Sequence, residues 1–294
     1  MPFLQALLNG ILVGGFYGFM VLGFSIIWGV MGIINLAHGE YVMVGAYFAW
    51  ALFRAMGIDP FVSALLVFPV MFVVGYVLQW LLINRVVERP HLISLLLNFG
   101  LSISIANVYK LIYTADYRSV TVPYSGSFEL AGFTLPTIKT AIFFAALAIM
   151  LALHLFLQHT RLGKAIRAAA QNKEAAKMVG MDIHRVYAAT AGICIGLTAM
   201  AGAMVAPIQP ISPFMGPLFT VKAFAITALG GLGRIPGALL GGLILGIVET
   251  LLTIYVPGVG AKVGTAVSFI LLVFVLVTRP QGLLSGLRPV EEGA

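Results

Sequence analysis

The sequence predicts an all-α polytopic membrane protein. Of its 294 residues, 61% are hydrophobic and only 9% are charged, and the mean hydropathy is +1.05. A soluble domain carries about 25% charged residues, so this chain has too little polar surface to cover a water-soluble globule. The apolar residues also gather in long runs separated by short polar stretches. We therefore expect a bundle of membrane-spanning helices.

The lengths of the apolar runs place the spans. A helix needs about 20 apolar residues to cross the hydrocarbon core of a bilayer. The run near 218–232 is short and ends in the glycine-rich break Gly230 to Gly233, and a polar break lies at Asn35–Glu40. Because of these interruptions, we expect about eight to nine transmembrane or half-membrane helices. They lie near 3–30, 38–56, 60–83, 92–112, 138–158, 187–207, 218–232, 237–255 and 261–278.

The whole chain, 1–294, is expected to be a single transmembrane domain with three parts outside the membrane. Residues 113–139 contain Val120, Val122 and Tyr124, then Phe128 and Leu130, which alternate with polar residues as in short strands. This stretch predicts an ordered extracytoplasmic cap or hairpin. Residues 159–185 are the most charged part of the chain and predict a cytoplasmic segment, and 280–294 form a polar tail on the same side.

The positive charges predict the orientation. The formal net charge is +7, and cytoplasmic loops of membrane proteins carry the excess of Lys and Arg. With the N-terminus outside, 11 cations lie in the cytoplasm and six lie at or near the outer face, which are Arg54, Lys110, Arg118, Lys139, Lys222 and Lys262. The basic residues do not alternate with aromatic ones, so we exclude nucleic-acid binding.

Glycines four residues apart occur in several spans, for example Gly10, Gly14 and Gly18. This spacing removes side chains from one helix face and allows another backbone to approach closely, either as static packing or at a moving contact. The two breaks are also similar to each other. Residues 34–40 and 232–238 each interrupt an apolar run and lead into a small-residue helix, as in transporters with an internal pseudo-repeat.

Five polar residues are candidates for a tentative translocation path because charged groups at membrane depth are costly. Asn35, His38 and Glu40 could form a polar cluster at a broken helix, or they could hold a helix terminus at the headgroup level. Asn98 lies among serines at near-helical spacing, which could line a path or bond back to their own helix. Glu249 lies within a span and could pair with Lys222 or line the path.

The segment 162–180 is rich in strong helix formers and predicts a short cytoplasmic helix. We expect Gly163 to precede it, Gly180 to close it as a C-terminal cap, and Asp182 to cap the next turn. Small residues leave a low-relief face that is framed by cations. Such a helix could dock in a groove of a partner protein, or it could be an ordinary solvated loop helix. The residues that we expect to couple to a partner are Gly163, Arg167, Glu174, Ala175, Ala176 and Gly180.

Three motifs carry a resemblance to a known family. Glu174-Ala175-Ala176, followed by Gly180, resembles the EAA loop of ATP-binding-cassette permeases. The segments 33–40 and 228–238 resemble signatures of the LivH/LivM branched-chain amino-acid permeases. The likeness covers nearly the whole chain and is closer to the LivH side.

The resemblance implies a LivH/LivM-type importer permease in a bacterial inner membrane. Its partners would be a second, LivM-like permease subunit, two ATPase subunits and an extracytoplasmic solute-binding protein, all embedded in or next to membrane lipid. Residues 174–180 would contact the ATPases and transmit their closure. The implied solute is a branched-chain or other hydrophobic amino acid, but members of this family also import urea, short amides and small aromatic or other carboxylates.

The sequence supports a division of labour between subunits. Gly163-Lys164 is followed by Ala165, and no phosphate-binding Gly-x-x-x-x-Gly-Lys-Ser/Thr motif occurs, so ATP and Mg²⁺ are expected on partner subunits and this chain binds no cofactor. We find no spacing for a metal site and no catalytic constellation, so we do not expect an enzyme. An ion-coupled secondary transporter that uses Glu249, or a passive channel, remains an alternative.

Overall fold

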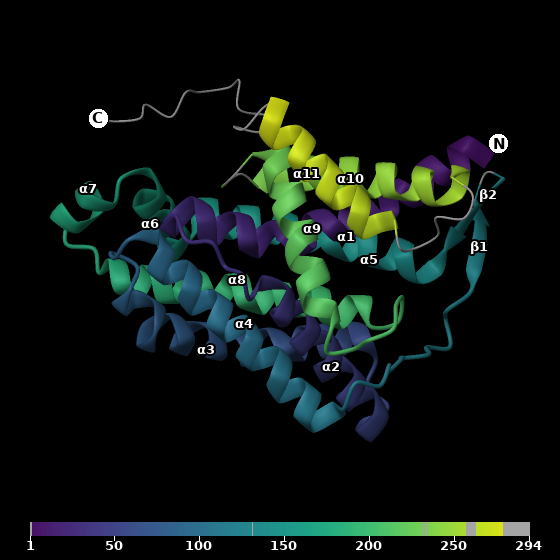
Figure 1. The fold of residues 1–294 in the computed structure, drawn as a ribbon, viewed down its shortest axis with the longest axis horizontal. Coiled ribbons are helices and arrows are strands. Elements are labelled where there is room, and N and C mark those ends of the chain that lie inside the picture. The colour runs from purple at the N-terminus through teal and green to yellow at the C-terminus, as the bar shows by residue number, and fades with distance from the viewer. Residues whose placement is uncertain (1, 131, 232, 234, 257–262, 279–294) are drawn as a thin grey trace.

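The computed structural model describes residues 2–130, 132–231, 233, 235–256 and 263–278. The predicted tail 280–294 and several cations, including Lys262, Arg234 and Arg279, lie outside the described residues. Figure 1 shows a bundle of long helices with a small hairpin at one end and two short helices at the other. The helices are α1 (Pro2–Met31), α2 (His38–Met56), α3 (Pro60–Leu81), the 3-10 turn η1 (Ile83–Arg85), α4 (His91–Tyr113), α5 (Thr137–His159), α6 (Arg161–Gln171), α7 (Lys173–Met178), α8 (Ile183–Val205), α9 (Met215–Gly230), α10 (Ile235–Tyr255) and α11 (Val263–Thr278).

Each predicted span corresponds to one helix of this bundle, with ends that differ by a few residues. Among the described residues, six helices are long and apolar enough to cross a membrane, which are α1, α3, α4, α5, α8 and α10. The expected short run is the 16-residue helix α9, which extends about 24 Å at the usual rise per residue. Figure 1 shows it running across the direction of α1 and α8.

Helix α8 lies at the centre of the bundle, with 94% of its most apolar window buried. Its small residues let the neighbouring helices approach closely. A Cβ atom on Gly192 would lie 2.8 Å from the carbonyl oxygen of Phe72 in α3, and one on Gly202 would lie 1.9 Å from that of Val42 in α2. The core therefore depends on the absence of side chains at these positions.

The predicted glycine contacts are confirmed between α1 and α10. A Cβ atom on Gly14 would lie 2.6 Å from the Cα atom of Leu243, and one on Gly246 would lie 2.4 Å from the backbone nitrogen of Gly14. Gly10 and Gly18 make contacts of the same kind, one turn to either side. The two antiparallel backbones thus touch along several turns.

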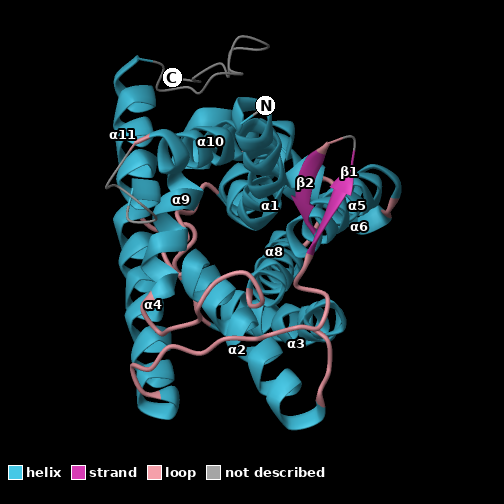
Figure 2. Ribbon diagram, turned by 90° about the vertical axis from the view of Figure 1, so that its right-hand side faces the viewer, coloured by secondary structure: helices cyan, strands magenta, loops and turns pink. Residues whose placement is uncertain are grey.

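The hairpin consists of β1 (Ser127–Leu130) and β2 (Phe133–Pro136), which pair in antiparallel register. Figure 2 shows it next to α5, and the Gln5 side chain of α1 bonds the backbone of Thr134. The alternation of Phe128 and Leu130 predicted a strand, and β1 confirms it. The strand predicted at Val120 and Val122 is wrong. These two residues lie in a non-strand segment and alternate because every second residue faces the core.

Helix α4 stands at the edge of the bundle (Figure 2), and only 11% of its most apolar window is buried. Most of its exposed side chains are apolar, for example Leu96, Phe99 and Leu111, although Ser104 and Asn107 are exposed as well. Its buried residues are the polar Ser94 and Asn98. This helix therefore presents a mainly apolar surface outward and polar side chains inward.

The close contact between α2 and α8 predicts the effect of a single methyl group. A Cβ atom on Gly45 would lie 1.9 Å from the carbonyl oxygen of Ala199. Because backbone cannot yield easily, we expect Gly45→Ala to lower the free energy of unfolding by about 1–3 kcal/mol. Thermal unfolding of the purified protein in detergent measures this change. Gly100→Ala in α4, where nothing lies within 4 Å, is the control, and equal midpoints for both variants would contradict the prediction.

Candidate functional site

The first candidate site is the break between α1 and α2, where six residues leave the helical path. The backbone turns at Gly32, which has a φ of +65°. The Asn35 side chain then accepts a hydrogen bond from the backbone nitrogen of Ala37 (3.1 Å), and the Thr220 hydroxyl of α9 accepts one from that of Gly39 (3.0 Å). The start of α2 is thus buried, and side chains satisfy its free backbone groups.

The neighbours of this break show how deep it lies. The His38 ring nitrogen Nε2 lies 3.1 Å from the carbonyl oxygen of Met20, well inside α1. Glu40 is fully buried, and its Oε1 accepts a hydrogen bond from the hydroxyl of Ser102 (3.2 Å), which lies midway along α4. His38 and Glu40 therefore lie in the middle of the bundle rather than at a helix terminus on its surface.

Glu40 sits between α4 and α9. Its Oε2 atom has no hydrogen-bond partner among the described residues. A Cβ atom on Gly216 of α9 would lie 2.2 Å from this oxygen, so the glycine provides the room for the carboxyl group. All three predicted residues, Asn35, His38 and Glu40, are buried at this break, and each has a different partner. Their role in a path stays a prediction, and the sequence did not reveal Ser102, Gly216 and Thr220 as their neighbours.

Asn98 is also fully buried on the inward side of α4. Its amide nitrogen donates to the carbonyl oxygen of Ser94 (2.8 Å), and its Oδ1 has no partner among the residues that the structure describes. Ser94 and Ser104 bond back to their own helix, as one of the two sequence interpretations expected. Ser102 differs, because its hydroxyl contacts Glu40.

Glu249 forms an ion pair with Lys222. The Lys222 Nζ lies 2.9 Å from both carboxylate oxygens, and the two side chains are only 12% and 17% exposed. The hydroxyl of Tyr17 donates to Glu249 (2.9 Å) and accepts a hydrogen bond from Lys222. The predicted salt bridge is confirmed. The structure buries most of Lys222 against α1 and α10, and its expected position at or near the outer face stays a prediction.

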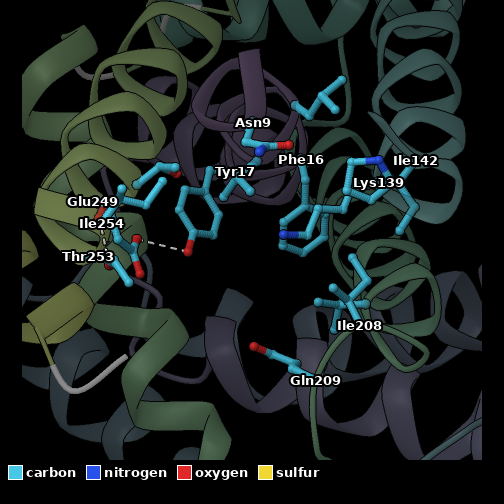
Figure 3. A pocket seen from close by; sticks show the side chains of 15 residues that line it. Asn9, Phe16, Tyr17, Lys139, Ile142, Ile208, Gln209, Glu249, Thr253 and Ile254 are labelled. Atoms are coloured by element: carbon cyan, nitrogen blue, oxygen red, sulfur yellow. Dashed lines mark hydrogen bonds between the residues drawn. The ribbon is translucent and has the colours of Figure 1, made fainter. Parts of the chain in front are cut away.

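A pocket of about 420 Å³ lies next to this ion pair, between α1, α5, α10 and the segment that follows α8. Figure 3 shows Tyr17 and Glu249 on one side, Lys139, Ile142 and Ile208 on the other, and Asn9 and Gln209 between them. Of the five predicted path residues, only Glu249 lines this pocket. The structure thus separates the path candidates into two groups.

The charged segment 159–185 forms two helices, α6 and α7, rather than the one continuous helix expected over 162–180. Asn172 separates them, and its side chain accepts from the backbone nitrogen of Ala175 (2.9 Å) as the N-terminal cap of α7. Thr160 caps α6 in the same way through Gly163 (2.9 Å). Asparagine is a strong cap but a weak helix former, which explains the break.

Gly163 was expected to precede the helix, but it lies within α6. A Cβ atom there would lie 2.3 Å from the carbonyl oxygen of Phe156, so the glycine allows α6 to pack on the end of α5. Arg167 is exposed on the other side of α6, and its guanidinium approaches the carbonyl oxygen of Gln158 (3.5 Å). Gly163 thus positions the helix, and its surface is not available to a partner.

The end of α7 follows the prediction for Gly180, which has a φ of +81°. Its nitrogen donates to the carbonyl oxygen of Lys177 (2.9 Å), and that of Met181 donates to Ala176 (3.1 Å). This is a Schellman motif, which glycine favours. Asp182 caps α8 through the backbone nitrogen of Arg185 (3.1 Å), as expected.

The faces of α7 divide its residues into two groups. Ala176 is buried, Ala175 is partly buried, and the side chain of Glu174 is 73% exposed. Met178 and Val179 are 82% and 74% exposed. Large apolar side chains at the tip of a charged segment form a small apolar knob, which the sequence interpretation missed.

A contact from a distant loop also escaped the sequence interpretation. Glu88, between α3 and α4, pairs with Lys173 (2.9 Å) and Lys177 (3.1 Å) of α7. These two cations lower the pKa of the Glu88 carboxyl to about 2. Glu88 therefore connects the α3–α4 loop to α7, although 85 residues or more separate the partners in sequence.

Removing one charge of the Lys222–Glu249 pair leaves the other buried without an opposite charge, because Tyr17 offers only a neutral hydroxyl. We expect Glu249→Gln to lower the free energy of unfolding by about 3 kcal/mol or more, because an uncompensated buried charge is costly. The double variant Lys222→Met, Glu249→Leu is the matched control and is expected to recover most of the loss. Thermal unfolding in detergent measures both, and an additive loss in the double variant would contradict the pairing.

Glu88→Gln is expected to loosen α7 without unfolding the bundle. Because the pKa of Glu88 is lowered in the folded state, its stabilising effect is present above a pH of about 4.5 and is lost as the pH falls toward 2. At pH 7 we expect hydrogen exchange of 173–178 to rise roughly two- to fivefold, as for other exposed ion pairs. Glu129→Gln in β1 serves as the control, and 1 M salt should reduce the difference.

The sequence is similar to a known protein family over most of its length. Residues 6–276 match the family described as the permease component of the branched-chain amino acid transport system. LivH of Salmonella typhimurium, named a high-affinity branched-chain amino acid transport system permease protein, is 35% identical over 99% of this chain and 97% of its own length. BraD of Pseudomonas aeruginosa, which carries the same description, is 33% identical over 99% and 97%. A probable LivH of Methanocaldococcus jannaschii is 29% identical over 90% and 87%.

A solved structure shares the fold. PsaBC from Streptococcus pneumoniae, in complex with Fab, superimposes with a TM-score of 0.52 at 14% identity and covers 97% of this chain and 95% of its own. The ribose import permease RbsC of Escherichia coli is 33% identical over 34% of each chain. The family match over residues 6–276 and the likeness to LivH over nearly the full length show the family. This multi-pass membrane chain belongs to the family of branched-chain amino acid transport system permease components.

Proposed function

We propose that this chain is the permease subunit of an ATP-driven importer in the bacterial inner membrane, and that the importer carries branched-chain or other hydrophobic amino acids. The observation that carries the proposal is the likeness to LivH over nearly the whole length of both chains. A permease of this family is a transporter rather than an enzyme. ATP and Mg²⁺ then bind to separate ATPase subunits, and this chain binds no cofactor.

The α6–α7 end of the bundle is the proposed contact with two ATPase subunits. Met178 and Val179 form an apolar knob that is closed by the Schellman motif at Gly180 and flanked by cations. A knob of this kind fits a groove in a partner protein better than it fits water. Glu174 and Arg167 are exposed beside it, whereas Gly163 and Ala176 hold α6 and α7 against the membrane helices.

A force applied at α7 has two routes into the bundle. Helix α6 packs on α5, α1 and α8, and Glu88 ties α7 to the loop that leads into α4. Movement of α7 would therefore reach both the central helices and the edge helix α4. The interior contact of α4 is the polar group Asn98, Ser102 and Glu40, so the second route ends at the middle of the bundle.

A second, LivM-like permease subunit is the proposed neighbour of α4. This helix exposes apolar side chains on the edge of the bundle, and its buried polar residues lie directly behind them. We propose that the solute crosses between the two subunits near Asn35, His38, Glu40 and Asn98. A solute-binding protein would deliver it to the cap segment 113–139, on the opposite end from α7.

The alternative functions, a secondary transporter or an importer of another solute, require different residues in the chain. A secondary transporter needs a free carboxylate that exchanges protons, and Lys222 and Tyr17 instead neutralise and hold Glu249. This pairing disfavours the ion-coupled alternative that uses Glu249. Urea, short amides and small carboxylates remain alternative solutes of the same machine, and they differ in whether they carry a carboxylate and an ammonium group.

The coupling role predicts the effect of Met178→Asp. Because Met178 is exposed, the substitution leaves the fold intact, but it places a charge in the proposed contact with the ATPase. In proteoliposomes that contain the permease pair, the ATPases and the binding protein, we expect ATP-dependent leucine uptake to fall about tenfold or more, in line with the loss of an interface hot spot. ATP hydrolysis should no longer respond to the loaded binding protein.

His184→Asp is the matched control, because His184 is exposed near the same end and is outside the knob. Normal uptake by Met178→Asp would overturn the docking role. Leucine uptake by the purified chain alone, driven by a pH gradient without ATP, would overturn the proposed importer in favour of a secondary transporter.

A further inference from the structure

The contact between α2 and α4 changes in character along its length. One face of α4 carries residues at helical intervals of four and seven, which are Asn98, Ser102, Tyr109 and Tyr113. The middle of this face is polar, because the Ser102 hydroxyl donates to the carboxyl group of Glu40 in α2 (3.2 Å). The end that leads into the cap segment is aromatic. The polar part is therefore closed off by aromatic rings on the cap side.

Three tyrosines form this aromatic closure. The Tyr47 ring of α2 stacks on that of Tyr113, with ring centroids 4.5 Å apart, and its centroid lies 5.2 Å from that of Tyr109. Tyr47 is only 1% exposed, so its neighbours cover it almost completely. The two helices meet here through side chains, since none of the described glycines brings their backbones into contact. Side chains can rotate aside, whereas two touching backbones cannot.

Arg118 of the cap segment fastens the closure from outside. Its guanidinium carbon lies 4.9 Å from the centroid of the Trp50 ring of α2, and its Nη2 donates to the carbonyl oxygen of Tyr113 at the end of α4 (3.2 Å). Its backbone exchanges two hydrogen bonds with Ile211, before α9 (2.8 and 2.7 Å). Figure 2 shows the segment after α4 crossing the end of the bundle next to α2. Arg118 thus joins α2, α4 and the segment that leads into α9.

The closed contact buries polar atoms that lack hydrogen-bond partners. Among the described residues, eight side-chain nitrogen or oxygen atoms have neither a partner nor surface open to water, and half of these lie in this region. They are Glu40 Oε2, Asn98 Oδ1, the Tyr47 hydroxyl and Arg118 Nε. A buried polar group without a partner is costly, and water would remove that cost if α2 and α4 separated. The closed arrangement is therefore poised to open.

We propose that Tyr47, Tyr109 and Tyr113 form the outer gate of the path between α2 and α4, and that Arg118 holds this gate shut. When the gate opens, water and the solute reach Ser102 from the cap side. The inference rests on the proposed function, because it adds a gate to the path proposed there. It also gives the cap segment a second task, since the residue that fastens the gate belongs to the segment on which a binding protein would sit.

Thiol labelling from outside tests the gate in spheroplasts that express the complete importer. Ser102→Cys places a thiol behind the gate, and its reaction rate with a membrane-impermeant methanethiosulfonate is measured on this chain by peptide mass spectrometry. We expect a slow reaction in the otherwise unaltered chain. Tyr113→Ala and Arg118→Met should each raise the rate about tenfold or more, because each removes an aromatic or cation–π contact that closes the gate.

Arg54→Met is the matched control for Arg118→Met. The Arg54 guanidinium also lies over the Trp50 ring (5.3 Å), but Arg54 belongs to α2 itself, so its loss leaves the connection to α4 in place. We expect no change in the labelling rate. Tyr47→Phe should lower the rate about threefold or more, because it keeps the ring and removes the hydroxyl that lacks a partner in the closed gate. Tyrosines that served packing alone would not produce this decrease.

Two further thiols separate opening of the gate from unfolding. Cys194, the only cysteine of the chain, is 0% exposed in α8, so its reaction reports loss of the core. Ser104→Cys lies on the exposed side of α4, and the gate variants should leave its rate unchanged. Faster labelling of Ser102→Cys with an unreactive Cys194 supports the gate. If Tyr113→Ala exposes Cys194, then Arg118→Met and Tyr47→Phe decide the result.

Unchanged labelling of Ser102→Cys in both Arg118→Met and Tyr47→Phe, or an equal increase in Arg54→Met, would overturn the gate. Failure of the gate and failure of the importer can be told apart. ATP-dependent leucine uptake that persists in such a case would reject only the gate, whereas leucine uptake without ATP would reject the proposed function whatever the labelling rates.

Discussion

In a lipid environment, a backbone polar group that leaves a helix must find its partner within the protein. The break between α1 and α2 meets this constraint with a few side chains. Asn35 and Thr220 accept from backbone nitrogens at the start of α2, and the His38 ring contacts the carbonyl oxygen of Met20. The transverse helix α9 serves the same need, because it supplies Thr220 and leaves room for Glu40 at Gly216.

The close packing of the helices supports this arrangement. A buried break can persist only if the surrounding helices are held firmly, and here they are held by contacts between backbones. Gly192 and Gly202 admit α3 and α2 to the surface of α8, and Gly14 admits α10 to α1. In contrast, α4 and the tip of α7 have few such contacts, and their connection through Glu88 is ionic. The molecule therefore combines a firmly packed centre with a more loosely held edge.

The sequence predicted the spans well because the cost of exposing polar groups to lipid acts on each segment separately. The caps at Gly180 and Asp182 were predictable for a similar reason, since each depends on a few neighbouring residues. The break at Asn172 was missed because strong helix formers on both sides masked one capping residue. The Glu88 contacts and the pocket beside Glu249 join residues far apart in sequence, which a local pattern cannot indicate. The path residues and the pseudo-repeat stay predictions.

The glycine contacts between α1 and α10 have a consequence for the way the subunit can change shape. Where backbones touch without intervening side chains, a small translation of one helix brings Cα atoms into collision, and only a shift by a full turn, about 5.4 Å, restores the fit. Interfaces of this kind change in discrete steps or not at all. During a transport cycle, α1 and α10 would then travel together as one rigid block, and adjustment would fall to helices whose interfaces are lined by long, compliant side chains.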